Sequence, residues 1–326
     1  MKQIKIFFED FDYWQGFDIS NNFITKILEK DYEIIIDPNP DYLFFSAYGY
    51  NHLKYRTCIK IYYSMENIEP DFNLCDYAIA FQHIQAGDRY LRYPYYLITG
   101  FERLNSQPFD IKQVLNRKFC NFVYSNSKWA DPLRKLFFEK LCKYKKVDSG
   151  GIYLNNIGAP VVDKMGFIKD YKFTIAFENS SLSGYTTEKI VEPMIVNSMP
   201  IYWGNPDIHL DFNTESFVSV NEYETIEGAI EEIIRLDNDD EAYIDKLSKP
   251  WYNGEDFFSY QLKLLSFLKN IFEQELSKAK RRTDYGFVRI YRRKQETMQQ
   301  LFQEKIMRLS LFNKEIKLLV STKIKK

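Results

Sequence analysis

The fold is decided by one stretch, which reads Tyr171-Lys-Phe-Thr-Ile-Ala-Phe-Glu-Asn-Ser180, then Gly184-Tyr-Thr-Thr-Glu-Lys-Ile190, then Pro200-Ile-Tyr-Trp-Gly-Asn-Pro206. It predicts a buried strand, a glycine turn, the start of a helix and a second, aromatic-rich strand. Glu188 and Lys189 stand where that helix should begin. Because a helix N-terminus offers unpaired N–H groups and positive potential, an anionic nucleotide would bind there.

Short apolar runs recur on both sides of this stretch. The runs before it lie at residues 2–8, 32–36, 42–46, 57–63 and 76–81, with a crossover helix expected at Asn21–Lys30. The second series has strands expected at 119–124, 173–177, 201–203 and 217–220, with helices at 129–143, 187–197 and 226–236. Runs that are apolar on both faces favour parallel sheets. Two consecutive α/β halves therefore predict two Rossmann-like domains facing a cleft.

The pattern breaks between residues 98 and 117, where Gly100, Ser106 and Pro108 occur among mixed polar residues. We take this segment as the linker. The predicted domains are residues 1–110, residues 111–275 and a basic helical tail at 276–326.

Composition indicates an ordinary globular protein, with 45% hydrophobic and 27% charged residues in a chain of 326. This length favours two domains. No apolar run approaches the roughly 18–20 residues that cross a bilayer. The four cysteines are scattered without a C-x-x-C pair and only three histidines occur, which favours reduced thiols over a zinc site.

The charge is distributed unevenly along the chain. Residues 278–326 contain 15 Lys and Arg against 4 Asp and Glu, whereas the preceding residues contain 29 against 41. Apolar positions in this tail alternate in steps of four and three with one lysine among them, at Met298, Phe302, Lys305, Leu309, Phe312, Ile316 and Leu319. A membrane-surface helix, a coiled coil between two subunits and a docked structural helix all fit this seam.

Familiar cofactor and hydrolase motifs are absent: the chain has no G-x-G-x-x-G, P-loop, H-E-x-x-H or G-x-S-x-G. Two D-x-D patterns occur, Asp10-Phe-Asp12 and Asp237-Asn-Asp239. Such a pattern can hold a divalent metal that bridges a nucleotide diphosphate. Asp237–Asp240 is predicted to be a solvated loop after a helix. Asp10 and Asp12 follow a predicted strand and keep a metal-dependent transferase open as an alternative.

Several further segments match one family in the same order. Phe177-Glu-Asn179, Gly184-Tyr-Thr-Thr-Glu-Lys189 and Pro200-Ile-Tyr-Trp-Gly204 resemble the signature of the α-1,3-fucosyltransferases, glycosyltransferase family ten. The other matching segments are Tyr63-Ser-Met-Glu-Asn67, Phe72-Asn-Leu-Cys-Asp-Tyr77, Arg89-Tyr-Leu-Arg-Tyr-Pro94, Phe119-Cys-Asn-Phe-Val-Tyr-Ser-Asn126 and Val147-Asp-Ser-Gly-Gly151. The resemblance spans residues 58–220, and the first 57 residues fit it only loosely.

The resemblance implies an α/β protein of GT-B type that transfers fucose from GDP-β-L-fucose with inversion. The acceptor would be the 3-hydroxyl of N-acetylglucosamine or glucose in N-acetyllactosamine-type glycans of a surface polysaccharide or lipopolysaccharide. The N-terminal half would bind the acceptor and the C-terminal half the donor. No cofactor and no dedicated metal site are implied, although a divalent ion could stimulate the reaction.

An inverting transfer needs one base to take the proton of the attacking hydroxyl. Glu66 follows a predicted strand and matches the base of the family; a surface acid or a capping acid is the alternative. Arg134 and Lys189 match the two cations that bind phosphate, and a solvated helix face is the alternative for Arg134. Tyr185 and Glu188 match positions near the donor, where a carboxylate suits a ribose hydroxyl pair, although Glu188 also suits the helix dipole.

Four weaker candidates complete the predicted site. Glu178 and Asn179 end a strand and are expected to touch nucleotide or fucose, with a plain turn as the alternative. Trp14 and Arg92 are candidates for acceptor binding.

The tail resembles the basic amphipathic tails of bacterial members. It implies a cytoplasmic enzyme held at the inner membrane face, with Arg281, Arg282, Arg292, Arg293 and Lys294 meeting anionic lipid. We expect deletion of residues 278–326 to leave kcat nearly intact. A GT-B transferase for another nucleotide sugar and a non-catalytic glycan- or nucleic-acid-binding protein remain alternatives, although no nucleic-acid recognition motif is present.

Overall fold

The computed structural model describes residues 1–11, 16–104, 109–125, 127–252, 254–283, 285–301 and 304–305. The chain divides into two compact units. Unit 1 comprises Met1–Tyr63, Pro70–Ala78 and the chain from Ile271 onward, and unit 2 comprises Ser64–Glu69 and Ile79–Asn270. These bounds differ from the predicted divisions at residues 110 and 275, because the chain returns to the N-terminal unit after residue 270.

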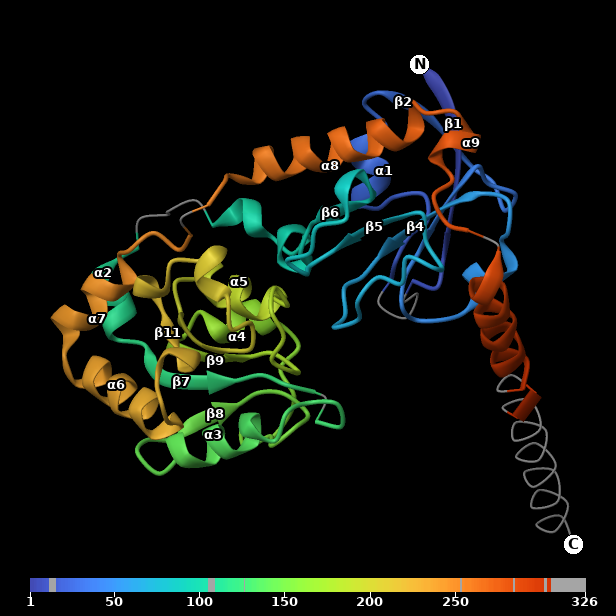
Figure 1. The fold of residues 1–326 in the computed structure, drawn as a ribbon. Coiled ribbons are helices and arrows are strands. Elements are labelled where there is room, and N and C mark those ends of the chain that lie inside the picture. Colours follow the sequence, from blue (N-terminus) through green and yellow to red (C-terminus); the bar gives the residue numbers. More distant parts are fainter. Residues whose placement is uncertain are drawn as a thin grey trace, which may run out of the picture. The chain divides into compact units, whose positions relative to one another are not determined.

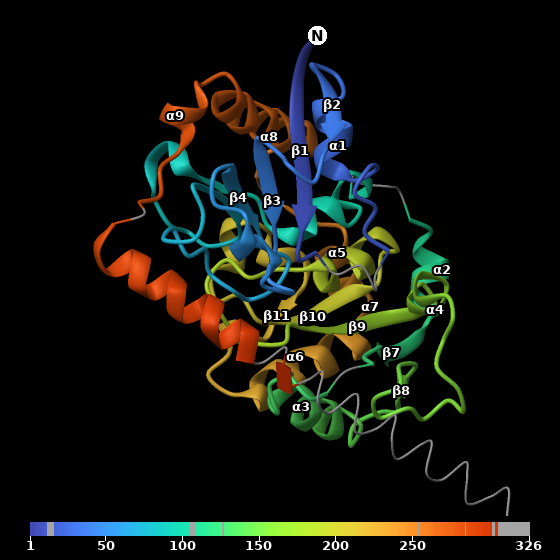
Figure 2. The ribbon, with the colours of Figure 1, turned by 90° about the vertical axis from the view of Figure 1, so that its right-hand side faces the viewer.

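The first sheet has the strand order β2-β1-β3-β4-β5-β6, and the boundary between the units falls within β5. The pairs β1–β2, β1–β3 and β3–β4 are parallel, as the apolar runs predict. Figure 2 shows β1, β3 and β4 side by side. Chain order reverses between β1 and β3, which makes that junction the topological switch point of the sheet. The strands are β1 (Lys2–Glu9), β2 (Tyr32–Ile36), β3 (Tyr42–Phe45), β4 (Ile59–Tyr63), β5 (Tyr77–Ala80) and β6 (Tyr90–Arg92).

The second sheet lies within unit 2 and has the order β11-β10-β9-β7-β8. Its neighbouring strands pair in parallel, and its switch point lies between β7 and β9, which pair at Asn121 and Thr174. Every residue of β9 is buried, so this strand forms the centre of the core. The strands are β7 (Lys118–Phe122), β8 (Val147–Ser149), β9 (Tyr171–Phe177), β10 (Met199–Trp203) and β11 (Val218–Ser219).

Helices cover both faces of the second sheet (Figure 1). On one face α4 and α5 are joined by an ion pair between Lys164 and Glu192, and on the other α3 and α6 are joined by one between Lys140 and Glu227. The helices of the chain are α1 (Phe23–Leu28), α2 (Ile111–Leu115), α3 (Leu133–Leu141), α4 (Lys164–Ile168), α5 (Glu188–Ile195), α6 (Ile226–Asn238), α7 (Asp240–Leu247), α8 (Phe257–Phe272) and α9 (Leu276–Ala279).

The segment after α9 is anchored to unit 1 by a buried ion pair between Arg282 and Asp76. The Asp76 carboxylate is fully buried and also accepts hydrogen bonds from the backbone N–H groups of Lys60, Arg281 and Arg282, each at 2.8 Å. Nη2 of Arg282 donates to the carbonyl of Cys58 at 2.8 Å. The prediction that Arg282 meets lipid is therefore wrong, because its guanidinium is held inside the protein.

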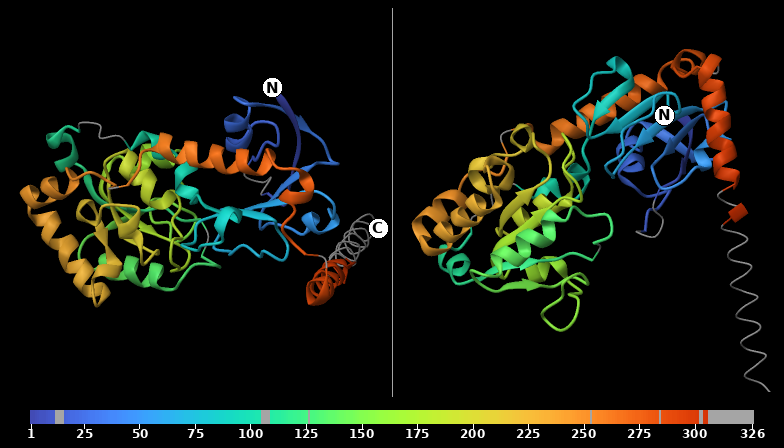
Figure 3. Two further views of the ribbon diagram at one scale, coloured as in Figure 1. Left: turned by 45° about the horizontal axis from the view of Figure 1, so that its top comes forward. Right: turned by 60° about the horizontal axis from the view of Figure 1, so that its bottom comes forward.

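The next residues, 286–301, form a helix beside the rest of unit 1 (Figure 3). Tyr291 donates to Asp71 at 2.7 Å, and Arg292 donates to the carbonyl of Asn73 at 2.9 Å. This part of the predicted tail is thus packed against the unit. Of the predicted seam, Met298 and Lys305 are described, and the other members lie outside the described residues.

Among the described helices, none is both long and apolar enough to span a bilayer. All four cysteines are free, and Cys58, Cys75 and Cys120 are buried.

Candidate active site

The candidate site lies at the switch point of the second sheet, where β7 and β9 end. Tyr124, two residues beyond β7, fixes the end of β9 with its hydroxyl group. The hydroxyl oxygen accepts a hydrogen bond from N–H of Phe177 at 2.6 Å, and the hydroxyl lies 3.0 Å from the carbonyl oxygen of Ile175. Ligands of parallel α/β sheets bind outside the carboxyl ends of the strands at this kind of junction.

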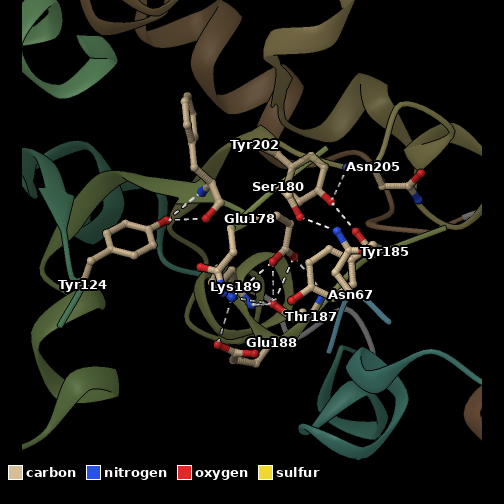
Figure 4. A network of polar contacts seen from close by, with 12 residues as sticks. Asn67, Tyr124, Glu178, Ser180, Tyr185, Thr187, Glu188, Lys189, Tyr202 and Asn205 are labelled. Atoms are coloured by element: carbon tan, nitrogen blue, oxygen red, sulfur yellow. Dashed lines mark hydrogen bonds and ion pairs between the residues drawn. The ribbon is translucent and has the colours of Figure 1, made fainter. Parts of the chain in front are cut away.

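Glu178, the first residue after β9, is fully buried. Its Oε1 accepts a hydrogen bond from N–H of Thr187 at 2.8 Å, and its Oε2 lies 3.1 Å from Nζ of Lys189. The same ammonium group is 2.9 Å from Oγ1 of Thr187 and 3.5 Å from Oε1 of Glu188. Figure 4 shows Lys189 between the two carboxylates.

Gly204, the residue after β10, makes room for the Glu178 side chain. A Cβ at position 204 would lie 2.5 Å from Cγ of Glu178, and the backbone φ there is +155°. A side chain is therefore excluded both by contact and by backbone conformation. Gly204 is therefore required for the buried position of the Glu178 side chain.

The charges of this cluster depend on one another. Burial disfavours the ammonium form of Lys189, but Glu178 and Glu188 outweigh it, so the pKa of Lys189 is raised well above its ordinary value. Burial raises the pKa of Glu178, and Lys189 only partly offsets this effect. The pKa of Glu188 is lowered, because Lys189 and Lys164 overcome the effect of burial. Lys189 therefore carries a fixed positive charge at neutral pH.

Glu188 and Lys189 are the first two residues of α5, as the sequence predicts. Thr187 is the N-cap, and its side chain accepts a weak hydrogen bond from N–H of Lys189 at 3.5 Å. The side chains of Glu188 and Lys189 are 28% and 15% exposed, so both reach the surface of the unit. Cation, carboxylate and helix N-terminus together suit a ligand that carries phosphate and sugar hydroxyl groups.

Arg134, on α3, contacts the residues at the carboxyl end of β9. Its Nη2 lies 2.9 Å from the carbonyl of Phe177, 2.8 Å from that of Glu178 and 2.9 Å from Oδ1 of Asn179. The guanidinium carbon lies 4.1 Å from the centre of the Tyr124 ring, and only 1% of the residue is exposed. Arg134 thus is no solvated surface group, and it positions the strand-end turn that carries Glu178 and Asn179.

Glu66 belongs to the same unit as this cluster. It stands three residues beyond β4, in a turn where Oγ of Ser64 donates to the carbonyl of Glu66 at 2.7 Å. The next residue, Asn67, donates to Oγ of Ser180, two residues after Glu178 (Figure 4). The carboxylate of Glu66 adds to burial and Glu178 in raising the pKa of Tyr185.

Tyr185 is buried, with 2% exposure, and its ring packs against Phe81 at 5.2 Å between centroids. Gly184 before it has φ +79°, and a Cβ there would lie 2.4 Å from the carbonyl oxygen of Phe81. This close approach places the loop after β5 against the turn that leads into α5. Tyr185 therefore supports the site from inside.

The weak acceptor candidates have different outcomes. Arg92 forms a paired contact with Asp211, at 2.8 and 2.6 Å, and its Nε donates to the carbonyl of Phe81 at 2.9 Å. These contacts give Arg92 a structural task within unit 2, and an acceptor role stays a prediction. Trp14 lies outside the described residues.

The two D-x-D patterns have their carboxylates occupied by protein groups where they are described. Asp237 lies inside α6 with 3% of its side chain exposed and accepts from Lys145 and Tyr144, both at 2.9 Å. The prediction that Asp237 lies in a solvated loop is therefore wrong. Asp10 accepts hydrogen bonds from Asn51 and His52, and Asp12 is not described. No group of three or more His, Cys, Asp or Glu among the described residues could hold a metal ion.

Sequence reasoning did not single out three residues of this network. Thr187 precedes Glu188 in a Thr-Thr-Glu run, which is a typical N-cap signal. Tyr124 and Asn67 offered no comparable signal, because their partners lie 53 and 113 residues away along the chain.

Two family models match the chain. The one described as "Alpha-(1,3)-fucosyltransferase FucT N-terminal domain" matches residues 6–99, and the one described as "Glycosyltransferase family 10 (fucosyltransferase) C-term" matches residues 115–262. A solved "alpha1,3-Fucosyltransferase with GDP-fucose" is 30% identical, with a TM-score of 0.72 over 84% of this chain and 92% of that chain.

The chain belongs to glycosyltransferase family 10.

Curated relatives agree with this membership. "Alpha-(1,3)-fucosyltransferase FucT" of Helicobacter pylori is 32% identical over 304 residues, which cover 79% of this chain and 63% of that relative. The "GDP-fucose protein O-fucosyltransferase 3" of Homo sapiens is 33% identical over 149 residues, or 42% of this chain and 31% of the relative. The family 10 chain thus spans less than two thirds of the length of these relatives. Its fold is of the GT-B type, with two Rossmann-like sheets, as predicted.

Proposed function

We propose that this family 10 chain is an inverting α-1,3-fucosyltransferase. It moves L-fucose from GDP-β-L-fucose to the 3-hydroxyl of N-acetylglucosamine or glucose in N-acetyllactosamine-type glycans. The observation that carries the proposal is the cluster of Glu178, Glu188 and Lys189 at the start of α5, at the carboxyl ends of β9 and β10. The similarity to a solved α1,3-fucosyltransferase with GDP-fucose supports the choice of donor.

In this proposal Lys189 stabilises the negative charge of the leaving group. As the bond from fucose to the β-phosphate breaks, negative charge grows on the diphosphate, and a fixed cation stabilises it. Lys189 stays protonated because Glu178 and Glu188 hold its pKa well above the ordinary value, against the effect of burial. Arg134 and Asn179 hold the turn beneath it, and direct contact of Arg134 with phosphate remains a prediction.

Glu188 and Glu66 take the two carboxylate roles. Glu188 is partly exposed at the first position of α5 and suits the paired hydroxyls of the ribose. Glu66 accepts the proton of the acceptor hydroxyl as its oxygen attacks the anomeric carbon from the face opposite GDP. The contact of Asn67 with Ser180 ties the Glu66 turn to the donor cluster within unit 2.

The decisive assay measures GDP release from GDP-fucose with N-acetyllactosamine, with and without EDTA. We expect acceptor-dependent release that resists EDTA, because no cofactor or dedicated metal site enters the proposal. Glu66→Gln should lower kcat by about 100-fold or more, because the side chain keeps its shape but loses the base. The matched control is Glu69→Gln, an exposed acid three residues later that should stay close to wild type.

Each outcome separates two parts of the proposal. No release with any GDP-sugar would overturn the donor assignment. Full activity of Glu66→Gln would remove Glu66 as the base and leave the donor assignment intact. NMR of the product settles inversion and linkage, since a β-linked or 4-linked fucose contradicts the proposal. The acceptor panel should include a serine- and threonine-containing peptide, because the name of the human relative refers to a protein acceptor.

We also propose a peripheral place at the inner face of the cytoplasmic membrane. Arg293 and Lys294 are exposed on the helix at 286–301, and each would contribute about 1 kcal/mol near an anionic surface. Flotation with vesicles of phosphatidylglycerol should retain the protein, whereas neutral vesicles should not. If Arg293→Glu/Lys294→Glu floats as well as wild type, this placement is wrong, and sedimentation velocity then tests pairing of two subunits.

A further inference from the structure

The first sheet has its own switch point, between β1 and β3, and the reaction proposed above leaves it unused. Asp10 directly follows β1, and the loop Ser46–Asn51 directly follows β3. We call this segment the β3 loop. Strand order β2-β1-β3-β4 makes this junction the place where an open parallel sheet receives a ligand.

Asp10 locks the β3 loop in one conformation. Its carboxylate is buried, with 4% exposure, and its Oδ1 accepts from N–H of Asn51 at 2.8 Å. Its Oδ2 accepts from N–H of His52 at 2.9 Å and from Nδ1 of the same ring at 2.6 Å. Gly49 leaves the space for this carboxylate, since a Cβ there would lie 2.4 Å from Oδ1.

The backbone at Asp10 is strained, because its φ is +60°, in the left-handed region that non-glycine residues seldom adopt. Such a conformation persists where the surroundings enforce it, most often at functional sites. His52 is fixed as well: its ring stacks on Phe45 with centroids 4.2 Å apart. Burial lowers the pKa of His52 although Asp10 opposes the effect, so the ring stays neutral and donates through Nδ1.

The locked loop carries two exposed aromatic side chains. Tyr48 is 41% exposed and Tyr50 is 51% exposed, while the neighbouring Phe44 and Phe45 are buried in the sheet. The loop holds these two partly exposed rings at the junction where such a sheet receives a ligand. It provides flat apolar faces with hydroxyl groups at the rim, which match the faces and hydroxyls of a pyranose ring.

We propose that the β3 loop is a carbohydrate platform on which a pyranose ring of the acceptor glycan stacks against Tyr48 and Tyr50. The proposal rests on the glycosyl transfer proposed above and adds the acceptor contact within unit 1. Asp10 and His52 are positioning residues, since they hold the loop and do not touch the sugar. Because the loop is fixed before binding, little conformational entropy is lost when the glycan docks.

The test measures the acceptor directly. Saturation-transfer NMR with N-acetyllactosamine as the probe, without donor, reports contact of the sugar with the full-length protein. Steady-state transfer then gives KM for acceptor and donor separately. Tyr50→Ala and Tyr48→Ala should each raise the acceptor KM about tenfold, which corresponds to the energy of one lost aromatic contact. The donor KM and GDP-fucose hydrolysis should stay unchanged.

Matched variants separate stacking from damage to the fold. Tyr50→Phe keeps the ring and should bind nearly as well as wild type. Tyr285→Ala removes a tyrosine that is 84% exposed in the same unit, and it should leave acceptor binding unchanged. Tyr285 follows Arg282, which contacts the carbonyl of Cys58 just before β4 begins, so it belongs to the opposite end of the strands.

The positioning role has its own comparison. His52→Asn keeps a donor near the Nδ1 position and should retain acceptor binding, whereas His52→Ala should raise the acceptor KM without changing kcat at saturation. The platform is overturned if wild type gives no saturation transfer to the sugar, or if both tyrosine-to-alanine variants keep the wild-type acceptor KM. In the second case the wild-type transfer activity still stands, so the proposed function survives.

Discussion

Replacement of Lys189 by methionine tests the charge balance of the site. The change removes the ammonium group 3.1 Å from Oε2 of Glu178 and leaves that fully buried carboxylate with only Thr187 as donor. Breaking a buried ion pair from one side costs about 3–5 kcal/mol. We expect Lys189→Met to lose that much free energy of unfolding at pH 7.5, measured by urea denaturation followed by circular dichroism.

The loss should depend on pH in a defined direction. Burial already raises the pKa of Glu178 above its unfolded value, and without Lys189 it rises further. The folded state then retains a proton that the unfolded state releases, so stability falls as the pH rises from the unfolded pKa through the folded pKa. The deficit of Lys189→Met should therefore be largest at neutral pH and shrink towards pH 4.5.

The double variant Glu178→Gln/Lys189→Met separates stability from chemistry. Without the buried charge, its free energy of unfolding should return to within about 1 kcal/mol of wild type. Transfer activity should stay about 100–1,000-fold below wild type, because the cation for the leaving diphosphate is still missing. The reasoning is refuted if the double variant is as unstable as the single one, or if its activity recovers with its stability.

Three further changes have defined outcomes. Gly204→Ala should destabilise unit 2 by about 2–4 kcal/mol in urea denaturation, because Cβ would lie 2.5 Å from Cγ of Glu178; an unchanged midpoint contradicts this. Tyr124→Phe should cost about 1–3 kcal/mol, because N–H of Phe177 loses its acceptor, and a neutral result would show that water replaces the hydroxyl. Burial, reinforced by Arg282, lowers the pKa of Lys60 to about 7, so the unfolded state binds more protons above that pH. Wild type should therefore gain about 2–3 kcal/mol between pH 6 and pH 9 relative to Lys60→Met; parallel stability curves would exclude the shift.

The sequence predicted the strands that form distinct apolar runs, but it did not predict the short strands β6 and β8. The run at 171–177 is one of the predicted strands, and the structure buries all of it. The sequence also predicted the helix start at Thr187, since a glycine turn, two threonines and an acid precede the apolar face. Local sequence carries the signals for these features, so no knowledge of distant residues was needed.

The burial of Glu178 could not be predicted from the residues adjacent to it in the sequence. An acid at the end of a strand has the same local sequence whether it faces solvent or the core. Only the approach of Gly204 and the reach of Lys189 across the turn decide it. Likewise, the sequence predicted a basic tail separate from the domains. The partner of Arg282, Asp76, lies 206 residues earlier, so local sequence does not reveal this contact. Deletion of residues 278–326 would leave that carboxylate buried without its cation, so we now expect it to destabilise unit 1.

The pairing of Asp76 with Arg282 also sets an order of events during biosynthesis. Unit 2 ends at Asn270, whereas unit 1 also contains the residues from Ile271 onward, which are translated afterwards. At roughly 5–20 residues per second, the ribosome needs about 10–40 s to deliver Arg282 after Asp76. During that interval Asp76 lacks its partner Arg282, while the residues up to Asn270 are completed and unit 2 can fold. Unit 1 therefore acquires its buried Asp76–Arg282 ion pair only after the residues of unit 2 have been synthesised.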